Sequence, residues 1–209
     1  MSKYLDRIFY INLDYRRDRR EEIEGVLREF DLMEKSERFI AHHIPEQGIL
    51  GCSISHLEVL KIAKERGYRH TLILEDDFEF VILKEEMERK LTDFFESELS
   101  NKYDVCMLSF NLEEISNEII SECDLVRKVL NAQTASGYIV NGDYLDTIIS
   151  LYEWSCPLLE RTKEHWNYAN DQCWKILQQR DRWFHFVERM GKQRSGFSDN
   201  SMDFIEYDC

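Results

Sequence analysis

The stretch His70-Thr-Leu-Ile-Leu-Glu-Asp-Asp77 decides the fold prediction, because an apolar run leads without a break into three acidic residues. Consecutive apolar residues, rather than alternating ones, are typical of a strand that is buried on both faces of a parallel sheet. Ile8-Phe-Tyr-Ile-Asn-Leu13 is a second run of this kind near the N-terminus. Ligands of open α/β sheets bind at the carboxyl ends of the strands. We therefore expect the chemistry of this chain just after these two runs.

Segments with the pattern of strands and of helices alternate along most of the chain. We expect strands at 8–13, 38–44, 70–74, 103–110, 136–141 and 183–188, and helices at 14–30, 53–66, 84–99, 144–154 and 170–180. Gly67 is placed to end the second of these helices. The alternation predicts βαβ units. The fold class is therefore α/β, a single domain over residues 1–209 with a mainly parallel sheet flanked by helices.

Composition narrows the classes of function. The chain has 209 residues and a formal net charge of −14, which disfavours nucleic-acid binding because phosphate is repelled. No apolar stretch approaches the roughly 20 residues of a membrane span, and the N-terminus lacks the layout of a secretory signal. None of the six cysteines forms a Cys-x-x-Cys pair. We interpret them as reduced thiols of a cytoplasmic protein.

The acidic turn Glu75-Asp76-Asp77 is the first candidate site. Adjacent carboxylates at the mouth of a strand repel one another unless a cation neutralises them. Oxygen ligands suit hard ions, so the turn predicts a site for Mn²⁺ or Mg²⁺ that is completed by phosphates of a substrate. A solvated acidic turn in an acidic protein is the alternative interpretation.

The segment after the first apolar run is the most basic part of the chain. It holds candidate nucleotide-binding residues, namely Asn12, Asp14, Arg16 and Arg19. Arginine offers paired donors to phosphate, and Asn or Asp after a strand is suited to ribose or base edges. Alternatively, this segment is a helix start whose arginines pair with nearby glutamates.

A further candidate is Gly51-Cys-Ser-Ile-Ser-His56, which is expected to open a helix with Ser53 as its N-cap. Free backbone N–H groups at a helix N-terminus bind anions, so Ser55 and His56 are candidate ligands of a diphosphate or a sugar. Alternatively, the serines only cap the helix and His56 has a structural role.

Together, these motifs resemble the family 25 glycosyltransferases, which include bacterial lipooligosaccharide and collagen hydroxylysine galactosyltransferases. The resemblance rests on Ile11-Asn-Leu-Asp-x-Arg-x-Asp-Arg19, on Gly51–His56 and on Leu72–Asp77. Two later blocks extend it, Asn170-Asp171 and Gln193-x-x-Gly-x-Ser-Asp199. The motifs occur in the family's order and span nearly the whole chain.

The resemblance implies a GT-A, Rossmann-like fold, a nucleotide-sugar donor (usually a UDP-sugar), a divalent cation and inverting transfer. The function expected is hexose transfer, of galactose or glucose, to a glycan or to a protein hydroxyl, as in lipopolysaccharide biosynthesis or collagen glycosylation. Residues of about 1–110 would form the nucleotide-sugar half, and about 111–209 the acceptor and catalytic half.

Each site residue then has an expected role. Glu75, Asp77 and Asp199 are the expected metal ligands, and Asp76 the cofactor-binding acid between the first two. Inverting transfer needs a base for the acceptor hydroxyl, and Asp171 is the candidate. Alternatively, Asp171 has only a structural role, in which its negative charge complements the dipole of its own helix.

Two other classes of protein remain open. One is a non-catalytic nucleotide-sugar or glycan-binding domain that acts as a subunit of a larger transferase. The other is a nucleotidyltransferase, which would carry a glycine-rich loop after the first strand, where residues 14–20 contain no glycine. The oligomeric state is open.

Overall fold

The structure is a computed structural model that describes residues 3–119, 125–198 and 203–205. Its strands are β1 (Arg7–Asn12), β2 (Ser36–Ile40), β3 (His70–Glu75), β4 (Phe78–Phe80), β5 (Val105–Met107), β6 (Asn111–Ile119), β7 (Val126–Gln133), β8 (Gly137–Asn141), β9 (Trp183–Phe186), β10 (Gly191–Gln193), β11 (Gly196–Ser198) and β12 (Asp203–Ile205). Its α-helices are α1 (Arg17–Glu29), α2 (Gly48–Glu65), α3 (Lys84–Glu96), α4 (Leu145–Thr162), α5 (His165–Tyr168), α6 (Asn170–Cys173) and α7 (Lys175–Arg180). Short 3₁₀ turns lie at Met33–Lys35, Glu98–Asn101 and Gly142–Tyr144.

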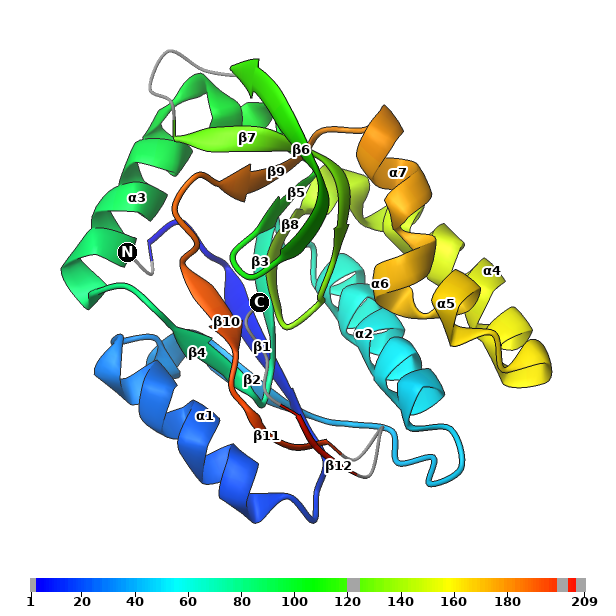
Figure 1. Ribbon diagram of the computed structural model, residues 1–209. Coiled ribbons are helices and arrows are strands. Elements are labelled where there is room, and N and C mark those ends of the chain that lie inside the picture. Colours follow the sequence, from blue (N-terminus) through cyan, green and yellow to red (C-terminus); the bar gives the residue numbers. More distant parts are fainter. Residues whose placement is uncertain (1–2, 120–124, 199–202, 206–209) are drawn as a thin grey trace.

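The main sheet has eight strands in the order β2-β1-β3-β8-β5-β9-β7-β6 (Figure 1). Within the described ranges, six of its strands run in one direction, and β7 and β8 run in the other. Strands β1 and β3 pair in parallel, with Ile11 opposite Glu75, so both end at the same edge. The prediction of a mainly parallel α/β sheet is confirmed.

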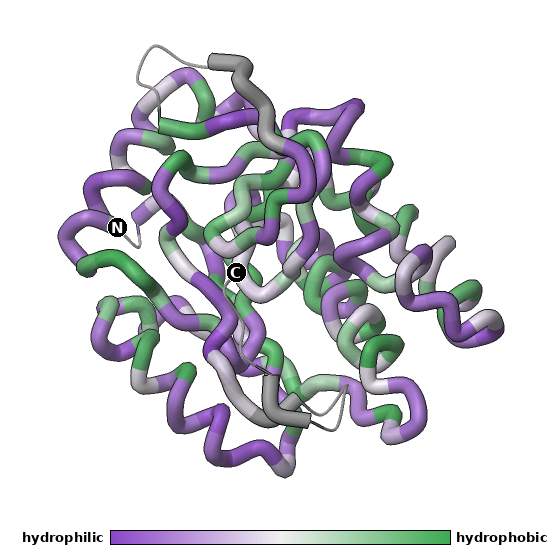
Figure 2. The backbone as a smooth tube through the Cα atoms, viewed as in Figure 1, coloured by the Kyte–Doolittle hydropathy of each residue, from purple (hydrophilic) through white to green (hydrophobic). Residues whose placement is uncertain are grey.

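Helices cover both faces of this sheet (Figure 1). Alternate residues of β3 enter different cores: Ile73 packs with α2 and α4, whereas Leu72 and Leu74 pack with α1 and α3. Burial on both faces explains why the strand sequence is continuously apolar. In Figure 2 the central strands are correspondingly hydrophobic, while α1 is coloured mainly as hydrophilic.

Several predicted boundaries are wrong. Helix α2 begins at Gly48 instead of residue 53, and α1 begins at Arg17 instead of residue 14. The helix expected at 170–180 is divided into α6 and α7, while α4 extends to Thr162. Gly67 does end α2, with a φ of +67°, a conformation that glycine adopts without steric cost.

The hairpin β6–β7 was missed by the sequence analysis. Its first strand, N-L-E-E-I-S-N-E-I, is rich in polar residues, and its pairing with β7 shifts register in several places. In β7 the buried positions are Val126, Val129 and Ala132, every third residue instead of every second. Neither strand therefore carries the period-two pattern by which strands are recognised.

A two-stranded sheet of β4 and β10 positions the acidic turn. It places Gln193 opposite Phe78, the residue that follows Asp77. The buried Phe78 ring packs closely against two glycines, because a Cβ built on Gly137 or on Gly191 would lie only 2.5 or 2.2 Å from ring carbons. The acidic turn is thus fixed to β8 and to the late segment of the chain.

Within the described parts of the chain, no helix combines the length and the apolar character that crossing a membrane requires.

Candidate functional site

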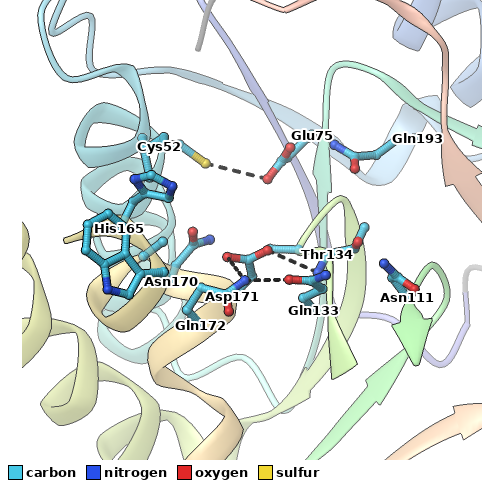
Figure 3. Close-up of a pocket in the computed structure, with 14 residues that line it drawn as sticks. Cys52, Glu75, Asn111, Gln133, Thr134, His165, Asn170, Asp171, Gln172 and Gln193 are labelled. Atoms are coloured by element: carbon cyan, nitrogen blue, oxygen red, sulfur yellow. Dashed lines mark hydrogen bonds between the residues drawn. The ribbon is translucent and has the colours of Figure 1, made fainter. Parts of the chain in front are cut away.

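A cavity of about 540 Å³ lies at the edge of the sheet where β3 ends. Its wall includes Cys52 from α2, Glu75 from β3, Trp166 from α5, Asp171 from α6 and Gln193 from β10. Figure 3 shows Glu75 and Asp171 on different parts of this wall, with polar side chains between and around them. Elements from four parts of the sequence, namely α2, β3, the consecutive helices α5 and α6, and β10, therefore meet at one polar cavity.

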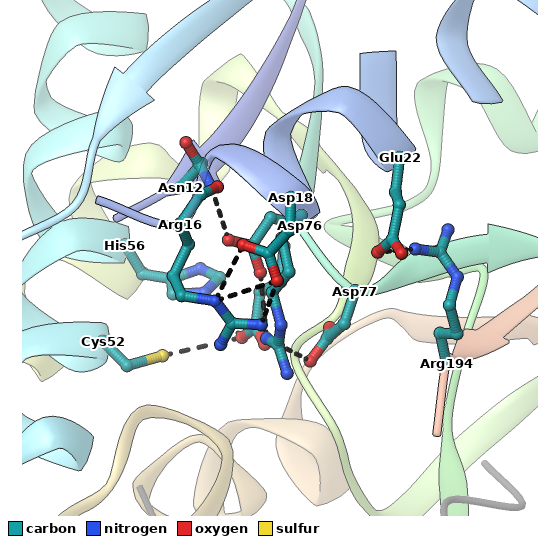
Figure 4. A network of polar contacts seen from close by, with 11 residues as sticks. Asn12, Arg16, Asp18, Glu22, Cys52, His56, Asp76, Asp77 and Arg194 are labelled. Carbon is teal, nitrogen blue, oxygen red and sulfur yellow. Dashed lines mark hydrogen bonds and ion pairs between the residues drawn. The ribbon is translucent and has the colours of Figure 1, made fainter. Parts of the chain in front are cut away.

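The acidic turn is held by groups that follow β1. The side-chain amide of Asn12 donates to Asp76 at 2.7 Å, and Arg19 donates to Asp76 at 3.1 Å and to Asp77 at 3.2 Å (Figure 4). Asn12 is buried, and the Arg19 side chain is 13% exposed. The structure thus brings Asn12, Arg19, Asp76 and Asp77 together, as expected if they form one site.

The carboxylates of the turn are poorly neutralised. Burial, Glu75 and Asp76 together raise the pKa of Asp77 to about 7, and burial raises the pKa of Asp76. Asp77 Oδ1 is buried and has no hydrogen-bond partner among the described residues. A buried carboxylate oxygen without a partner, beside two further acids, fits a hard divalent cation.

Glu75 has a different set of neighbours from those of Asp76. Its Oε1 lies 3.1 Å from His56 Nε2 and 3.6 Å from the Cys52 sulfur. Burial works to raise the pKa of Glu75, but its neighbours together, with the hydrogen bond from His56 first among them, outweigh burial, so the pKa is lowered. Burial also raises the pKa of the Cys52 thiol well above its ordinary value. Glu75 is therefore an ionised carboxylate on the cavity wall.

The prediction that a helix begins at Ser53 is wrong. Because α2 begins at Gly48, Ser53 and Ser55 lie inside the helix and are buried. Ser55 Oγ donates to Gly51 O at 2.7 Å and accepts from His42 N at 2.8 Å. Its hydroxyl is thus used within the fold, and α2 presents no free N–H groups at this position. His56, one residue further, is buried and reaches Glu75.

The two remaining candidates after β1 differ in exposure: Asp14 is exposed, whereas the Arg16 side chain is 14% exposed and Arg16 O accepts from Asn12 Nδ2 at 3.0 Å. The Asp14 side chain is 75% exposed and pairs with Arg38 at 3.2 Å. Arg16 pairs with Asp18 at 2.8 Å, and this contact lowers the pKa of Asp18 to about 2. Their contribution to nucleotide binding stays a prediction, as do the roles of all the site residues.

Asp171 lies at the start of α6 and lines the cavity. Its Oδ2 accepts from the backbone N–H of Thr134 at 3.2 Å, and burial raises its pKa. Helix α6 is anchored to α2, because Ser53 Oγ accepts a hydrogen bond from Asn170 N at 3.2 Å. Thr134 has a φ of +85°, an unusual conformation for a β-branched residue. The tertiary contacts therefore fix Asp171 at the cavity.

The late segment reaches the acidic turn. Arg194 N donates to Asp77 O at 2.6 Å, and its side chain pairs with Glu79 at 3.3 Å and with Glu22. Gln193 lines the cavity. Asp199, the expected third metal ligand, lies outside the described residues.

Some residues of the cavity were not singled out by the sequence analysis. Cys52 was interpreted only as a reduced thiol, Gln133 and Gln172 were given no role, and Gln193 was quoted only as the first residue of the late block. The spacing of Cys52 and His56, four residues apart on one helix, is a signal that places both side chains on one face. No comparable local signal marks the glutamines.

Comparison with known proteins supports the fold. No protein-family model matches the sequence, and no curated protein matches it. Among solved structures, a glycosyltransferase involved in the glycosylation of the major capsid of PBCV-1 matches with a TM-score of 0.57 at 10% identity, covering 93% of this chain and 95% of that one. The chain shares its fold with this glycosyltransferase.

Two further structures have lower scores. The glycosyltransferase GlyE of Streptococcus pneumoniae gives a TM-score of 0.45 at 14% identity, covering 87% of this chain and 38% of that one. The galactosyltransferase LgtC, in complex with donor and acceptor sugar analogues, gives 0.45 at 13% identity and covers 85% and 72%. At these values neither adds to the argument, and the PBCV-1 protein shows likeness in fold alone.

Proposed function

We propose that this chain is a metal-dependent, inverting glycosyltransferase that moves a hexose, galactose or glucose, from a UDP-sugar to a hydroxyl of a glycan or of a hydroxylysine-type protein side chain. The observation that supports this most is the cavity at the end of β3. It has the ionised carboxylate of Glu75, the first residue of the acidic turn, on one side and the half-buried carboxyl of Asp171 on another. A GT-A-like fold places donor and acceptor at this edge of the sheet.

On the donor side, Glu75 and Asp77 would hold a Mn²⁺ or Mg²⁺ ion, with Asp199 as the third expected ligand. A bound ion of this kind supplies a Lewis acid that stabilises the leaving nucleoside diphosphate. Asn12 and Arg19 keep Asp76 in place, and Arg19 would offer guanidinium donors to a phosphate of the donor. These contacts suit a charged nucleotide better than a neutral ligand.

On the acceptor side, Asp171 would act as the base. The acceptor oxygen attacks the anomeric carbon, the bond from that carbon to the diphosphate oxygen breaks, and the diphosphate leaves with the electron pair. Asp171 takes the proton of the acceptor hydroxyl as the new bond forms. Attack opposite the leaving group inverts the configuration. Burial raises the pKa of Asp171, which makes its carboxylate a stronger base.

Calorimetric titration of UDP, with Mn²⁺ and with EDTA, tests the donor side. We expect UDP to bind at least about tenfold more tightly with Mn²⁺, a difference of about 1.4 kcal/mol. The variant D77N should remove that difference. The matched control is D146N, which changes an exposed acid on α4, where the Asp146 side chain is 76% exposed. Equal affinity with and without Mn²⁺ in the unchanged protein would contradict the proposal.

The variant D171N tests the base. We expect turnover to fall about 10²- to 10⁴-fold, the usual contribution of a general base, while UDP affinity stays within twofold of that of D146N. Full turnover in D171N would remove Asp171 from the mechanism. Hydrolysis of UDP-sugars by the unchanged protein separates a transferase from a non-catalytic binding domain, which would bind the donor without consuming it.

A further inference from the structure

Three side chains of different chemistry converge where α2 meets the end of β3. One sulfur, one imidazole nitrogen and one carboxylate oxygen, from Cys52, His56 and Glu75, all lie within 4.8 Å of one another. We propose that these three residues form a binding site for a soft or borderline divalent ion of the Zn²⁺ class, distinct in chemistry from the oxygen-only site of the acidic turn.

The set of donor atoms selects the ion. Thiolate and imidazole are ligands that Zn²⁺ and Co²⁺ prefer over Mg²⁺ or Mn²⁺, and a carboxylate completes many such sites. Asp76 and Asp77 offer oxygen only, and they are held by Arg19. The two sites are therefore expected to favour different ions, although Glu75 is shared between them.

Secondary structure already provides the convergence. Cys52 and His56 are four residues apart on α2, so their side chains leave the same face of the helix. Glu75 is the last residue of β3 and reaches that face, with its Oε1 3.1 Å from His56 Nε2 and 3.6 Å from the Cys52 sulfur. An ion that replaced these hydrogen bonds would join helix and strand without a rearrangement of the backbone.

The imidazole is oriented by a second contact. Its Nδ1 lies 3.0 Å from the hydroxyl of Tyr138 on β8, and both side chains are buried. A hydroxyl accepts as readily as it donates, so Tyr138 Oη can accept a hydrogen bond from Nδ1–H when Nε2 binds an ion. Such a partner on the far nitrogen of a ligating histidine is the usual support for a metal site.

The site is also accessible. Cys52 and Glu75 both line the cavity of about 540 Å³, whereas His56 closes the site from the protein side. Three protein ligands beside a cavity leave a position for water, as in open zinc sites. On binding, the thiol gives up its proton to solvent and the thiolate becomes the ligand, with no change of oxidation state.

Titration of metal-free, untagged protein with Co²⁺, in the presence of a phosphine reductant, tests the proposal without reference to catalysis. We expect one equivalent of Co²⁺ to give a thiolate-to-cobalt charge-transfer band and the visible bands of a four-coordinate ion. Zn²⁺ should remove both, and Mn²⁺ should not. The variant C52S should lose the charge-transfer band, and Y138F should weaken Co²⁺ binding about tenfold or more.

Other thiols provide the controls. The variant C156S changes a buried thiol on α4, and C123S/C209S removes two thiols outside the described residues; all should keep the full band. Circular dichroism confirms that each variant is folded, and E75Q serves as a second ligand variant if C52S is not. A spectrum without the charge-transfer band, or one that C52S leaves unchanged, overturns the proposal. Because UDP is absent throughout, failure here is distinguishable from failure of the proposed function.

Discussion

The substitution G137A tests how the fold fixes the acidic turn. A Cβ on Gly137 would lie 2.5 and 2.6 Å from two carbons of the Phe78 ring, about 1 Å closer than van der Waals contact allows. Gly191 also lies against this ring, because a Cβ there would be 2.2 Å from ring carbons, so the ring has little room to adjust. Overpacking of a buried site costs about 1–3 kcal/mol, and we expect a value near 3.

Urea unfolding of the metal-free protein measures this loss, with G25A as the matched control. Gly25 lies inside α1, and a Cβ there meets nothing within 4 Å. The same exchange should therefore stabilise the protein by up to about 1 kcal/mol through helix propensity. In thermal unfolding, G137A should lower the Tm by roughly 6–12 °C.

A double-mutant cycle assigns the loss to its cause. F78L replaces the ring by a smaller side chain, so G137A should cost at least about 1 kcal/mol less in the F78L background than alone. A cost of G137A within about 0.5 kcal/mol of zero, or a cost equal in both backgrounds, would refute the argument that the Phe78 ring is confined by two glycines.

Three further outcomes follow from single residues. Burial, Glu75 and Asp76 raise the pKa of Asp77 to about 7, so between about pH 4 and 7 the folded state keeps a proton that the unfolded state has lost. The free energy of unfolding of the metal-free protein should therefore fall as pH rises from about 4 to 7. Urea unfolding at these two pH values should show a smaller fall for D77N. Trp166 is 62% exposed at the cavity, where its ring is available to stack on the face of an acceptor sugar. W166A should therefore raise the KM for a sugar acceptor about fivefold, because about 1 kcal/mol of stacking is lost. UDP affinity, measured by calorimetry, should be unchanged. Gly67 has a φ of +67°, so G67A should cost about 1 kcal/mol and G67N less, as measured by thermal unfolding.

The sequence predicted strands β1 and β3 well, because both are buried on two faces and are therefore continuously apolar. It did not predict the start of α2, since Ile49 and Leu50 extend the helix backward from Ser53 and only packing shows where the helix begins. Hairpin β6–β7 was missed because β6 is rich in polar residues and because the buried positions of β7 are three residues apart. These failures share one reason. The spacing of apolar residues predicts which positions are buried, but here the buried positions depend on contacts with residues that are distant in the sequence.

The candidate site divides in the same way. An acidic turn directly after a buried strand is a local feature, and so are the polar residues after β1; sequence alone placed both at one edge of a sheet. The partners of those acids are long-range: Glu75 contacts His56 of α2, Asp171 accepts from Thr134, and Arg194 binds the turn from the far end of the chain. Such contacts depend on how helices cross the sheet, so only the tertiary structure gave Glu75 a thiol and an imidazole as neighbours and brought Asp171 to the cavity.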